Sequence, residues 1–267
     1  MVRADLHNHL RGDMGTQESR LTFNRVIDFA SKRLGPGGIF GLVNMNGKDT
    51  IDRRYEQFIK SREAQGYEGL NFGNAICVPN KEILVIKAQE VRTNKGHLLC
   101  LGVRENRSLR SGANVSLDDA LKEADDNNCV KIVDHPFYLE GMGSFLSQNP
   151  EYLEKIDGFE VHNGEAALWI PFMKNTYNAN EKAREFFDSE IRDKHNVGAV
   201  YSSDGHSLGE LGSSWMEILM PDISNSEKLI SSLREEIRQI PENYQAKNSV
   251  IPAFMHAAKM AINFYKR

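Results

Sequence analysis

The stretch ADLHNHL, residues 4–10, is the most informative part of the chain, because it places His7 and His9 two positions apart after an apolar start. In a β-strand, residues i and i+2 point to the same face. The two imidazoles therefore leave one face of a strand end together and can reach a single metal ion. The stretch predicts a first strand over residues 2–6 that leads into a metal site.

Further candidate ligands stand beside apolar runs of strand length. They are Glu90 at the end of 82–90, His97 at the start of 97–103, His135 after 129–134, and Asp204 and His206 after 197–202. Ligand sites of α/β folds gather beyond the carboxyl ends of parallel strands. Only His97 precedes its strand, and a short hairpin from Glu90 to His97 would return it to the same rim.

Apolar runs alternate with helical patterns along the chain, which predicts an α/β fold with a mainly parallel sheet, open or closed. The other expected strands are 38–44, 72–78, 158–162 and 215–220, and the expected helices are 21–34, 50–65, 117–127, 181–194, 226–239 and about 250–266. Residues 105–115 and 141–150 are predicted loops. Neither loop is long enough to be a clear domain linker, so we expect one domain.

Composition excludes few classes of protein. The 267 residues carry a formal net charge of −4, which gives no reason to expect a nucleic-acid or membrane partner. No apolar run could span a bilayer, and the amino terminus lacks the apolar segment of a signal peptide. Cys77, Cys100 and Cys129 lie in apolar runs without zinc-site spacing. We therefore expect reduced, buried thiols in a cytoplasmic protein.

The donor types indicate which ions fit. Imidazoles with a shared carboxylate suit Zn²⁺, Mn²⁺ or Fe²⁺, whereas Ca²⁺ prefers oxygen ligands. A single histidine is more often structural, but coincidence does not explain why so many candidate ligands stand at strand ends. They suffice for two ions.

Five segments in this order, ADLHNHL, QEV…GHLLCLG, VDHPF, DGFEVHNG and SSDGHS, resemble the motifs of the PHP (polymerase and histidinol phosphatase) family over roughly residues 4–220. The resemblance implies a distorted seven-stranded β/α barrel with metals at the carboxyl ends of its strands. It implies a metal-dependent phosphoesterase. Residues 1–267 would then be a single PHP-like domain, with helices from about 224 packed on the barrel.

The resemblance also implies a role for each candidate ligand. One ion would be held by His7, His9 and Asp204, and a second by His97 and His135. Glu90 would bridge the two ions, and His206 matches a ligand of a third ion. The expected catalytic groups are Glu90, Asp204 and His206.

The third metal position is where the chain departs from the family. Asn44 and Met45 stand where an Asp-His pair is usual, and Asp13 matches another family ligand only loosely. A thioether is a poor ligand for hard divalent ions. We therefore predict two tightly held ions of Mn, Zn or Fe. The third site would be vacant or filled only with substrate, which leaves His206 as a general acid or phosphate contact.

The expected reaction is hydrolysis of a phosphate monoester of a small metabolite or nucleotide by a hydroxide that bridges two metal ions. Arg11 and Arg92 are candidate phosphate donors, because a guanidinium binds phosphate in a bidentate manner. His162 is a candidate substrate contact at a strand end, whereas Asp134 is expected to be a loop residue.

Two alternatives stay open. One is a phosphodiesterase or exonuclease-like activity, since related domains are attached to DNA polymerases, although the chain lacks a basic surplus. The other is a non-catalytic domain that binds metal for stability or holds a ligand. The presence of Glu90 and Asp204 argues against complete loss of catalysis. The phosphate ester, the metal and the oligomeric state stay open at this point.

Overall fold

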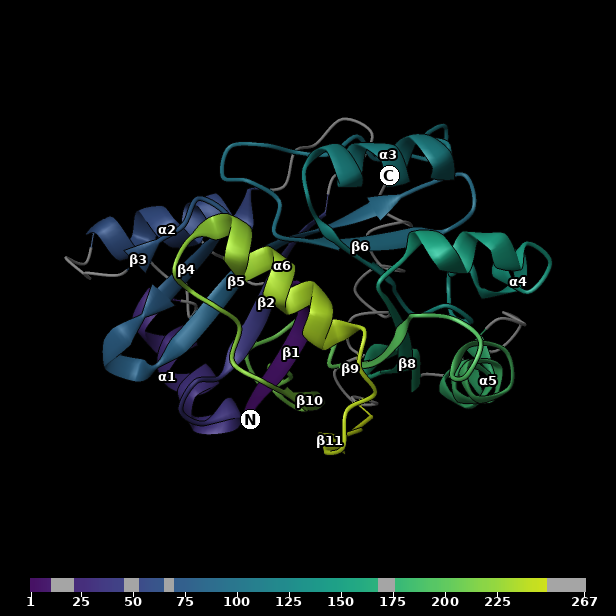
Figure 1. Cartoon of the computed structure of the whole chain (residues 1–267). Coiled ribbons are helices and arrows are strands. Elements are labelled where there is room, and N and C mark those ends of the chain that lie inside the picture. The colour runs from purple at the N-terminus through teal and green to yellow at the C-terminus, as the bar shows by residue number, and fades with distance from the viewer. Residues whose placement is uncertain (11–21, 46–52, 65–69, 168–175, 249–267) are drawn as a thin grey trace, which may run out of the picture.

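A computed structural model describes residues 1–10, 22–45, 53–64, 70–167 and 176–248 of the chain. Its described strands form one mixed sheet whose main path runs β11-β10-β1-β2-β5-β6-β7-β8-β9. The two ends of the seven-strand stretch from β1 to β9 approach each other, because Asn8 forms a parallel bridge with Gly205 directly after β9. The sheet therefore curls into a nearly closed, barrel-like shape (Figure 1).

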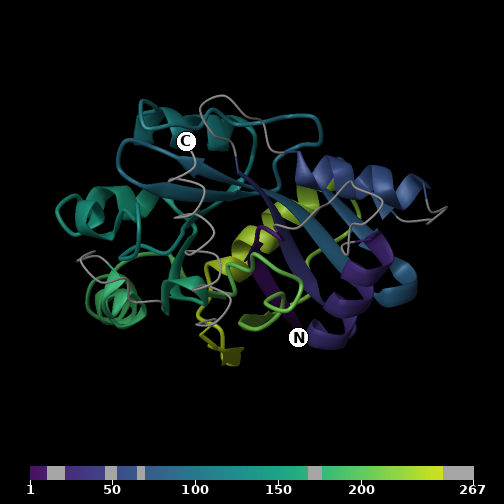
Figure 2. The ribbon, with the colours of Figure 1, turned by 180° about the vertical axis from the view of Figure 1, so that it is seen from behind.

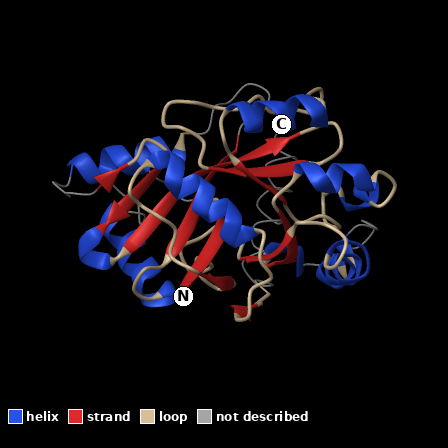
Figure 3. Ribbon diagram, viewed as in Figure 1, coloured by secondary structure: helices blue, strands red, loops and turns tan. Residues whose placement is uncertain are grey.

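The strands are β1 (Val2–Asn8), β2 (Ile39–Met45), β3 (Leu70–Asn71), β4 (Ala75–Val78), β5 (Ile83–Arg92), β6 (His97–Leu101), β7 (Val130–Val133), β8 (Gly158–Asn163), β9 (Gly198–Ser202), β10 (Trp215–Ile218) and β11 (Tyr244–Gln245). The helices are α1 (Phe23–Leu34), α2 (Arg54–Ala64), α3 (Leu117–Asp126), α4 (Gly143–Leu146), α5 (Ala179–Phe186) and α6 (Ser226–Ile237), and a π-helix (Phe187–Ile191) extends α5. Figure 3 distinguishes the strands from the helices that surround them.

The sheet is mixed, so the expectation of a mainly parallel sheet holds for only part of it. Strands β1, β2 and β5 are parallel, as are β7, β8 and β9, but β6 runs antiparallel to both β5 and β7. Only four residues separate β5 from β6, and a parallel connection needs a dozen or more. The hairpin expected between Glu90 and His97 is confirmed, with Arg92 opposite His97.

Helices cover the sheet on both sides. The two opposite views place α1 and α2 at one side of the molecule and α4 and α5 at the other (Figure 2). The Ser116 hydroxyl accepts the Asp119 N–H at 3.0 Å, which is the expected cap of α3. The predicted loop 141–150 instead contains α4, a single turn too short for helical periodicity to signal. The expected helix at 250–266 lies outside the described residues.

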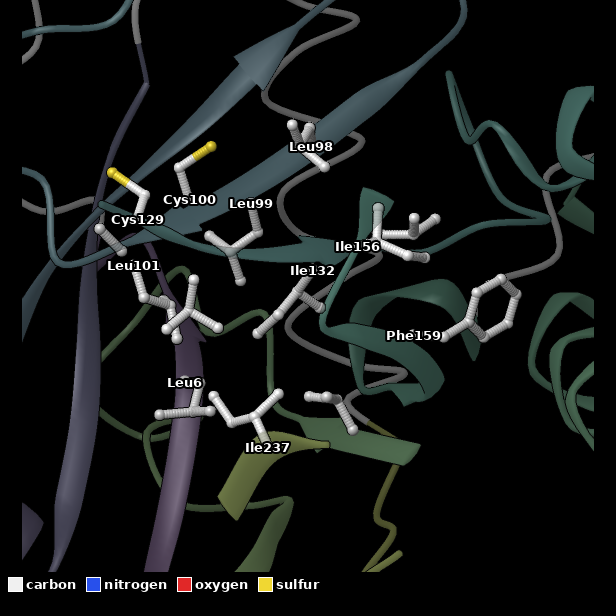
Figure 4. Close-up of a cluster of buried hydrophobic side chains, with 14 of the residues drawn as sticks. Leu6, Leu98, Leu99, Cys100, Leu101, Cys129, Ile132, Ile156, Phe159 and Ile237 are labelled. Atoms are coloured by element: carbon white, nitrogen blue, oxygen red, sulfur yellow. The ribbon is translucent and has the colours of Figure 1, made fainter. Parts of the chain in front are cut away.

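A continuous apolar core fills the interior of the sheet. Figure 4 shows Leu6 of β1, Leu99 and Leu101 of β6, and Ile132 of β7 gathered in one cluster with Ile237 of α6. All three cysteines are free and buried, as expected. No described helix combines the length and apolar character needed to cross a membrane.

Helix α6 closes the amino-terminal end of the barrel-like sheet. Its Arg234 donates to the carbonyl oxygens of Asn128 and Cys129, just before β7 begins. Its Ile237 packs so closely on Gly158 and Gly198, the first residues of β8 and β9, that a Cβ at Gly198 would lie 1.7 Å from the Ile237 carbonyl oxygen. The carboxyl end of the parallel strands is left for the candidate site.

Candidate metal centre

The predicted ligands gather at the carboxyl rim of the sheet. His7 lies near the end of β1, Glu90 near the end of β5, and Asp204 two residues after β9. The β5–β6 hairpin brings His97 to this rim, and His135 follows β7. Their donor atoms form three groups, each with potential ligand atoms within 4.8 Å of one another.

The first group consists of His7, His9 and Asp204, all buried. The Nε2 atoms of His7 and His9 lie 3.1 Å apart. Asp204 Oδ1 lies 3.4 Å from His7 Nε2 and 3.5 Å from His9 Nε2. The HxH pair on one strand face therefore turns both imidazoles to one point, and a carboxylate oxygen faces the same point.

Glu90 links the first group to the second. Its Oε2 atom lies 3.1 Å from His9 Nε2, whereas its Oε1 atom lies 3.3 Å from His135 Nε2 and contacts His97 Nδ1. One carboxylate therefore faces two sets of nitrogen donors with its two oxygens. Such a side chain can serve two cations at once.

The second group contains Glu90, His97, Asp134 and His135. Asp134 lies in the loop that follows β7, as expected, but its place among the candidate ligands was not anticipated. Its carboxylate is fully buried, and its Oδ2 atom lies 3.8 Å from His135 Nε2. Asp134 follows β7 directly, where the strand delivers it to the interior of the rim.

The third group joins Asp204 and His206 to Glu165, a residue that the sequence motifs did not mark. His206 Nδ1 lies 2.8 Å from Glu165 Oε2 and 2.9 Å from the Asp204 carbonyl oxygen. Glu165 follows β8 in a 3₁₀ turn, and it is the residue directly after the motif DGFEVHNG. Its position on a loop gave no periodic signal.

Asn44, in place of a family ligand, is used by the surrounding fold. Its Nδ2 donates to Glu56 Oε2 at 3.1 Å, and its Oδ1 accepts the Tyr55 N–H at 3.1 Å. Glu56 also pairs with the fully buried ammonium of Lys87, which donates to two backbone carbonyls. An amide engaged in this way has no oxygen directed to the three ligand groups.

Several buried donor atoms at the rim have no hydrogen-bond partner within the described part of the chain. They are His9 Nδ1, both Asp134 oxygens, His135 Nδ1 and Asp204 Oδ1. A buried polar atom without a partner costs free energy. Imidazole nitrogens and carboxylate oxygens in this arrangement are the donor set that Zn²⁺, Mn²⁺ and Fe²⁺ accept. The residues therefore fit divalent metal ions.

Glu160 of β8 holds the first group in place, and sequence reasoning did not select it. Its Oε1 atom lies 2.9 Å from His7 Nδ1 and accepts the Ser202 hydroxyl. Its Oε2 atom accepts the His135 N–H at 2.7 Å and the Asn163 amide at 2.9 Å. A carboxylate between the apolar residues Phe159 and Val161 of a buried strand was the available signal.

The charges of these side chains are strongly perturbed. Burial raises the pKa of Glu160, but His7, His135 and the Ser202 hydroxyl together lower it to about 2. Burial lowers the pKa of His9 to about 4, which favours the neutral imidazole that a metal ion requires. For His97, burial lowers the pKa, but the carboxylates of Glu90, Glu140 and Asp134 together raise it to about 11. Perturbed groups of this kind cluster at functional sites.

Two candidate ligands have left-handed backbone conformations. The φ angle is 28° at His135 and 47° at Asp204. Residues other than glycine seldom adopt positive φ, and such strain persists where the surrounding structure enforces it. Hydrogen bonds help to hold these two backbone conformations. Glu160 accepts the His135 N–H, and Asn163 donates to Asp204 Oδ2 at 3.2 Å.

Unlike the predicted metal ligands, the predicted substrate contacts do not all lie together at the rim. Arg11 lies outside the described residues. Arg92 is half exposed and pairs with Glu140, whose Oε2 atom also lies 2.9 Å from His97 Nε2. His162 is buried and lines a hollow of about 510 Å³ beside α5, and no ligand group includes it. Arg54, which the motifs did not mark, donates to the His9 carbonyl oxygen at 2.6 Å.

Residues 178–236 match a family model described as PHP-associated. No curated protein matches the chain in sequence. Several solved structures share its fold. The lesion-specific endonuclease PfuEndoQ from Pyrococcus furiosus is 16% identical with a TM-score of 0.51, and the match covers 89% of this chain and 56% of that chain.

A complex of Endonuclease Q with a 27-mer duplex substrate that carries an abasic lesion at the active site is 15% identical, with a TM-score of 0.52 and the same two coverages, 89% and 56%. PsfC from Pseudomonas syringae PB-5123 is 11% identical with a TM-score of 0.57, and the match covers 98% of both chains. The chain thus spans little more than half the length of the endonuclease chains and nearly the full length of PsfC.

Proposed function

We propose that the chain is a PHP-like, metal-dependent phosphoesterase, since residues 178–236 match a PHP-associated family model. One observation carries the proposal. The two oxygens of Glu90 face two different groups of imidazole donors, with Oε2 3.1 Å from His9 Nε2 and Oε1 3.3 Å from His135 Nε2. A structural site for one ion needs no such shared carboxylate.

In this proposal, His7, His9 and Asp204 hold one Mn²⁺, Zn²⁺ or Fe²⁺, and His97 and His135 hold a second, with Glu90 between them. When bound, such ions supply an activated water and neutralise charge on phosphoryl oxygens. The side chain of Glu160 keeps His7 Nδ1 occupied, which leaves His7 Nε2 for the cation.

The remaining rim residues would bind and protonate the substrate. His206 would donate a proton to the leaving alcohol or contact the phosphate, with Glu165 2.8 Å from its Nδ1 to orient the ring. Arg92 would bind a phosphoryl oxygen, as would Arg11 from the segment after β1. His162 would contact the rest of the substrate from the hollow beside α5.

We propose that the barrel comprises the seven strands from β1 to β9 along the main path, with the Asn8–Gly205 bridge at its seam. Residues 1–267 would form one domain around it. The buried residues Leu229, Ile230, Leu233 and Ile237 of α6 support the packing of the helix that follows residue 224.

A small phosphate monoester is the leading substrate class, because the chain has a formal net charge of −4 and therefore no excess of basic residues for a polynucleotide. A DNA phosphodiester is the second candidate. The observation that favours it is the likeness in fold to an endonuclease in complex with a DNA duplex.

The test is phosphate release by Mn²⁺-reconstituted protein from nucleoside monophosphates, sugar phosphates, histidinol phosphate and a chromogenic phosphodiester. A DNA duplex with an abasic lesion is assayed beside them. Turnover of a monoester that Asp204→Asn abolishes would support a phosphatase. Cleavage of diesters or DNA alone would replace it by the second candidate. Metal binding without any turnover would contradict both and favour a binding domain.

A further inference from the structure

Asp134 is a buried carboxylate whose environment is incomplete. Its side chain is 0% exposed, and neither oxygen has a hydrogen-bond partner in the described part of the chain. A carboxylate in the interior needs hydrogen bonds or a cation to offset the loss of hydration. Among the described residues, Asp134 has no hydrogen bond, and its nearest charged neighbour is the His135 imidazole at 3.8 Å.

Other buried carboxylates in the same sheet are fully satisfied. Asp5 is equally buried, and it accepts the Ser203 N–H at 3.0 Å and the Gly212 N–H at 2.7 Å. Asp157, just before β8, accepts the Lys131 N–H at 2.8 Å and pairs with Arg238. The fold thus supplies hydrogen-bond donors to these two buried acids, whereas none of the described residues donates to Asp134.

The neighbours of Asp134 are themselves candidate metal ligands. Its ligand oxygen lies within 4.8 Å of donor atoms from Glu90, His97 and His135. Its Oδ2 atom is 3.8 Å from His135 Nε2. Two donors that are each about 2.1 Å from one ion can be up to ~4.2 Å apart, so these two atoms can share a cation without a change of backbone.

We propose that Asp134 is a ligand of the second ion and makes this position more favourable to Mn²⁺ relative to Zn²⁺. This inference rests on the proposed metal centre. With Asp134, the second group has two carboxylates and two imidazoles, whose formal charge balances a divalent cation. Added carboxylate oxygens favour hard ions such as Mn²⁺, whereas imidazole nitrogens suit Zn²⁺.

In the experiment, the metal-free full chain is titrated with Mn²⁺, and the electron paramagnetic resonance signal of free Mn²⁺ reports binding. A second titration uses Zn²⁺ in competition with a chromophoric chelator. Asp134→Asn keeps the shape of the side chain and removes its charge. Asp157→Asn is the matched control, since it neutralises a buried acid outside the ligand groups. We expect wild type and control to bind two Mn²⁺.

In Asp134→Asn, the affinity of the weaker of the two Mn²⁺ sites should fall at least about tenfold, and the affinity for Zn²⁺ should fall less. The metal-free variant should melt at or above the metal-free wild type, because an unpaired buried charge is gone, and metal should raise its melting temperature less. Asp134→Ser provides the same comparison if the Asn variant does not fold.

Two Mn²⁺ with unchanged affinities in Asp134→Asn would overturn the role of Asp134 and leave the proposed metal centre intact. A wild type that binds no ion would overturn both. Metal-free variants that are much less stable than metal-free wild type would show that Asp134 has a structural partner, and this result would also overturn the inference.

Discussion

The Nδ1 atom of His7 lies 2.9 Å from Oε1 of Glu160, and this contact joins β1 to β8 across the interior of the barrel-like sheet. The acceptor at Nδ1 fixes the proton there and turns Nε2 toward His9 and Asp204. Since Glu160 also accepts the His135 N–H, one carboxylate orients residues of both main ligand groups.

The first prediction concerns Glu160→Gln, which keeps the size of the side chain but removes its charge. We expect metal affinity to fall about 10–100-fold, because the orienting partner of His7 is weakened. Titration with Mn²⁺ measures the effect, with the exposed Glu235→Gln on α6 as control. An unchanged affinity would show that Glu160 only fills space.

The second prediction concerns the buried pair of Glu56 and Lys87. Burial raises the pKa of Glu56, but the Lys87 ammonium outweighs it and holds the pKa below its ordinary value of 4.5. A lowered folded pKa means that the stabilisation is complete above about pH 4.5 and is lost as the pH falls further. The free energy of unfolding of Glu56→Gln should therefore lack the part of its decrease at low pH that comes from protonation of Glu56.

The same Glu56→Gln substitution leaves the Lys87 ammonium buried without its carboxylate. Loss of one partner of a buried pair costs up to about 3–5 kcal/mol in the free energy of unfolding at neutral pH. Urea unfolding of both proteins at pH 7 and at pH 4 tests both statements. Parallel pH curves for wild type and variant would contradict the proposed electrostatic role.

The third prediction separates stability from metal binding. Ile237→Ala, at the amino-terminal end of the sheet, should lower the free energy of unfolding by about 2–5 kcal/mol because it leaves a cavity in the core. The folded variant should bind metal with wild-type affinity, since α6 and the ligands occupy opposite ends of the strands. A parallel loss of metal affinity would show that the two ends are coupled.

The fourth prediction concerns Arg92, whose guanidinium pairs with Glu140 at the rim. If it holds a phosphoryl oxygen, Arg92→Ala should raise KM about tenfold or more with a smaller change in kcat. Arg92→Lys should recover only part of the affinity, because an ammonium cannot bind in a bidentate manner. Equal KM values for all three proteins would place substrate elsewhere.

Much of the rim could be predicted because periodicity and strand ends are local properties. The HxH pair, the Glu90–His97 hairpin and the histidine after β7 all depend on residues close in sequence to a strand. The strand boundaries for β5 and β9 differ from expectation by at most two residues, because continuous apolar runs mark buried strands.

The rest depended on tertiary structure. Glu160 was not selected, since its partners His7 and Ser202 lie 153 and 42 residues away. Glu165 gains its place from a turn after β8 that no pattern signals. Asp134 was not selected as a ligand because a polar loop residue after a strand is usually exposed, whereas here the next residue takes a positive φ and the carboxylate stays inside.

The positive φ angles at His135 and Asp204 also limit which substitutions evolution or an engineer can use there. Asn, Asp and His tolerate this conformation better than other residues with a side chain, whereas β-branched residues do not. Apart from glycine, the residues that this backbone favours at both positions, Asn, Asp and His, all carry side chains that can bind a metal ion. Most other replacements of His135 or Asp204 would therefore cost conformational free energy in addition to the loss of a metal ligand. Asp204→Asn should disturb the backbone least, because Asn also tolerates positive φ.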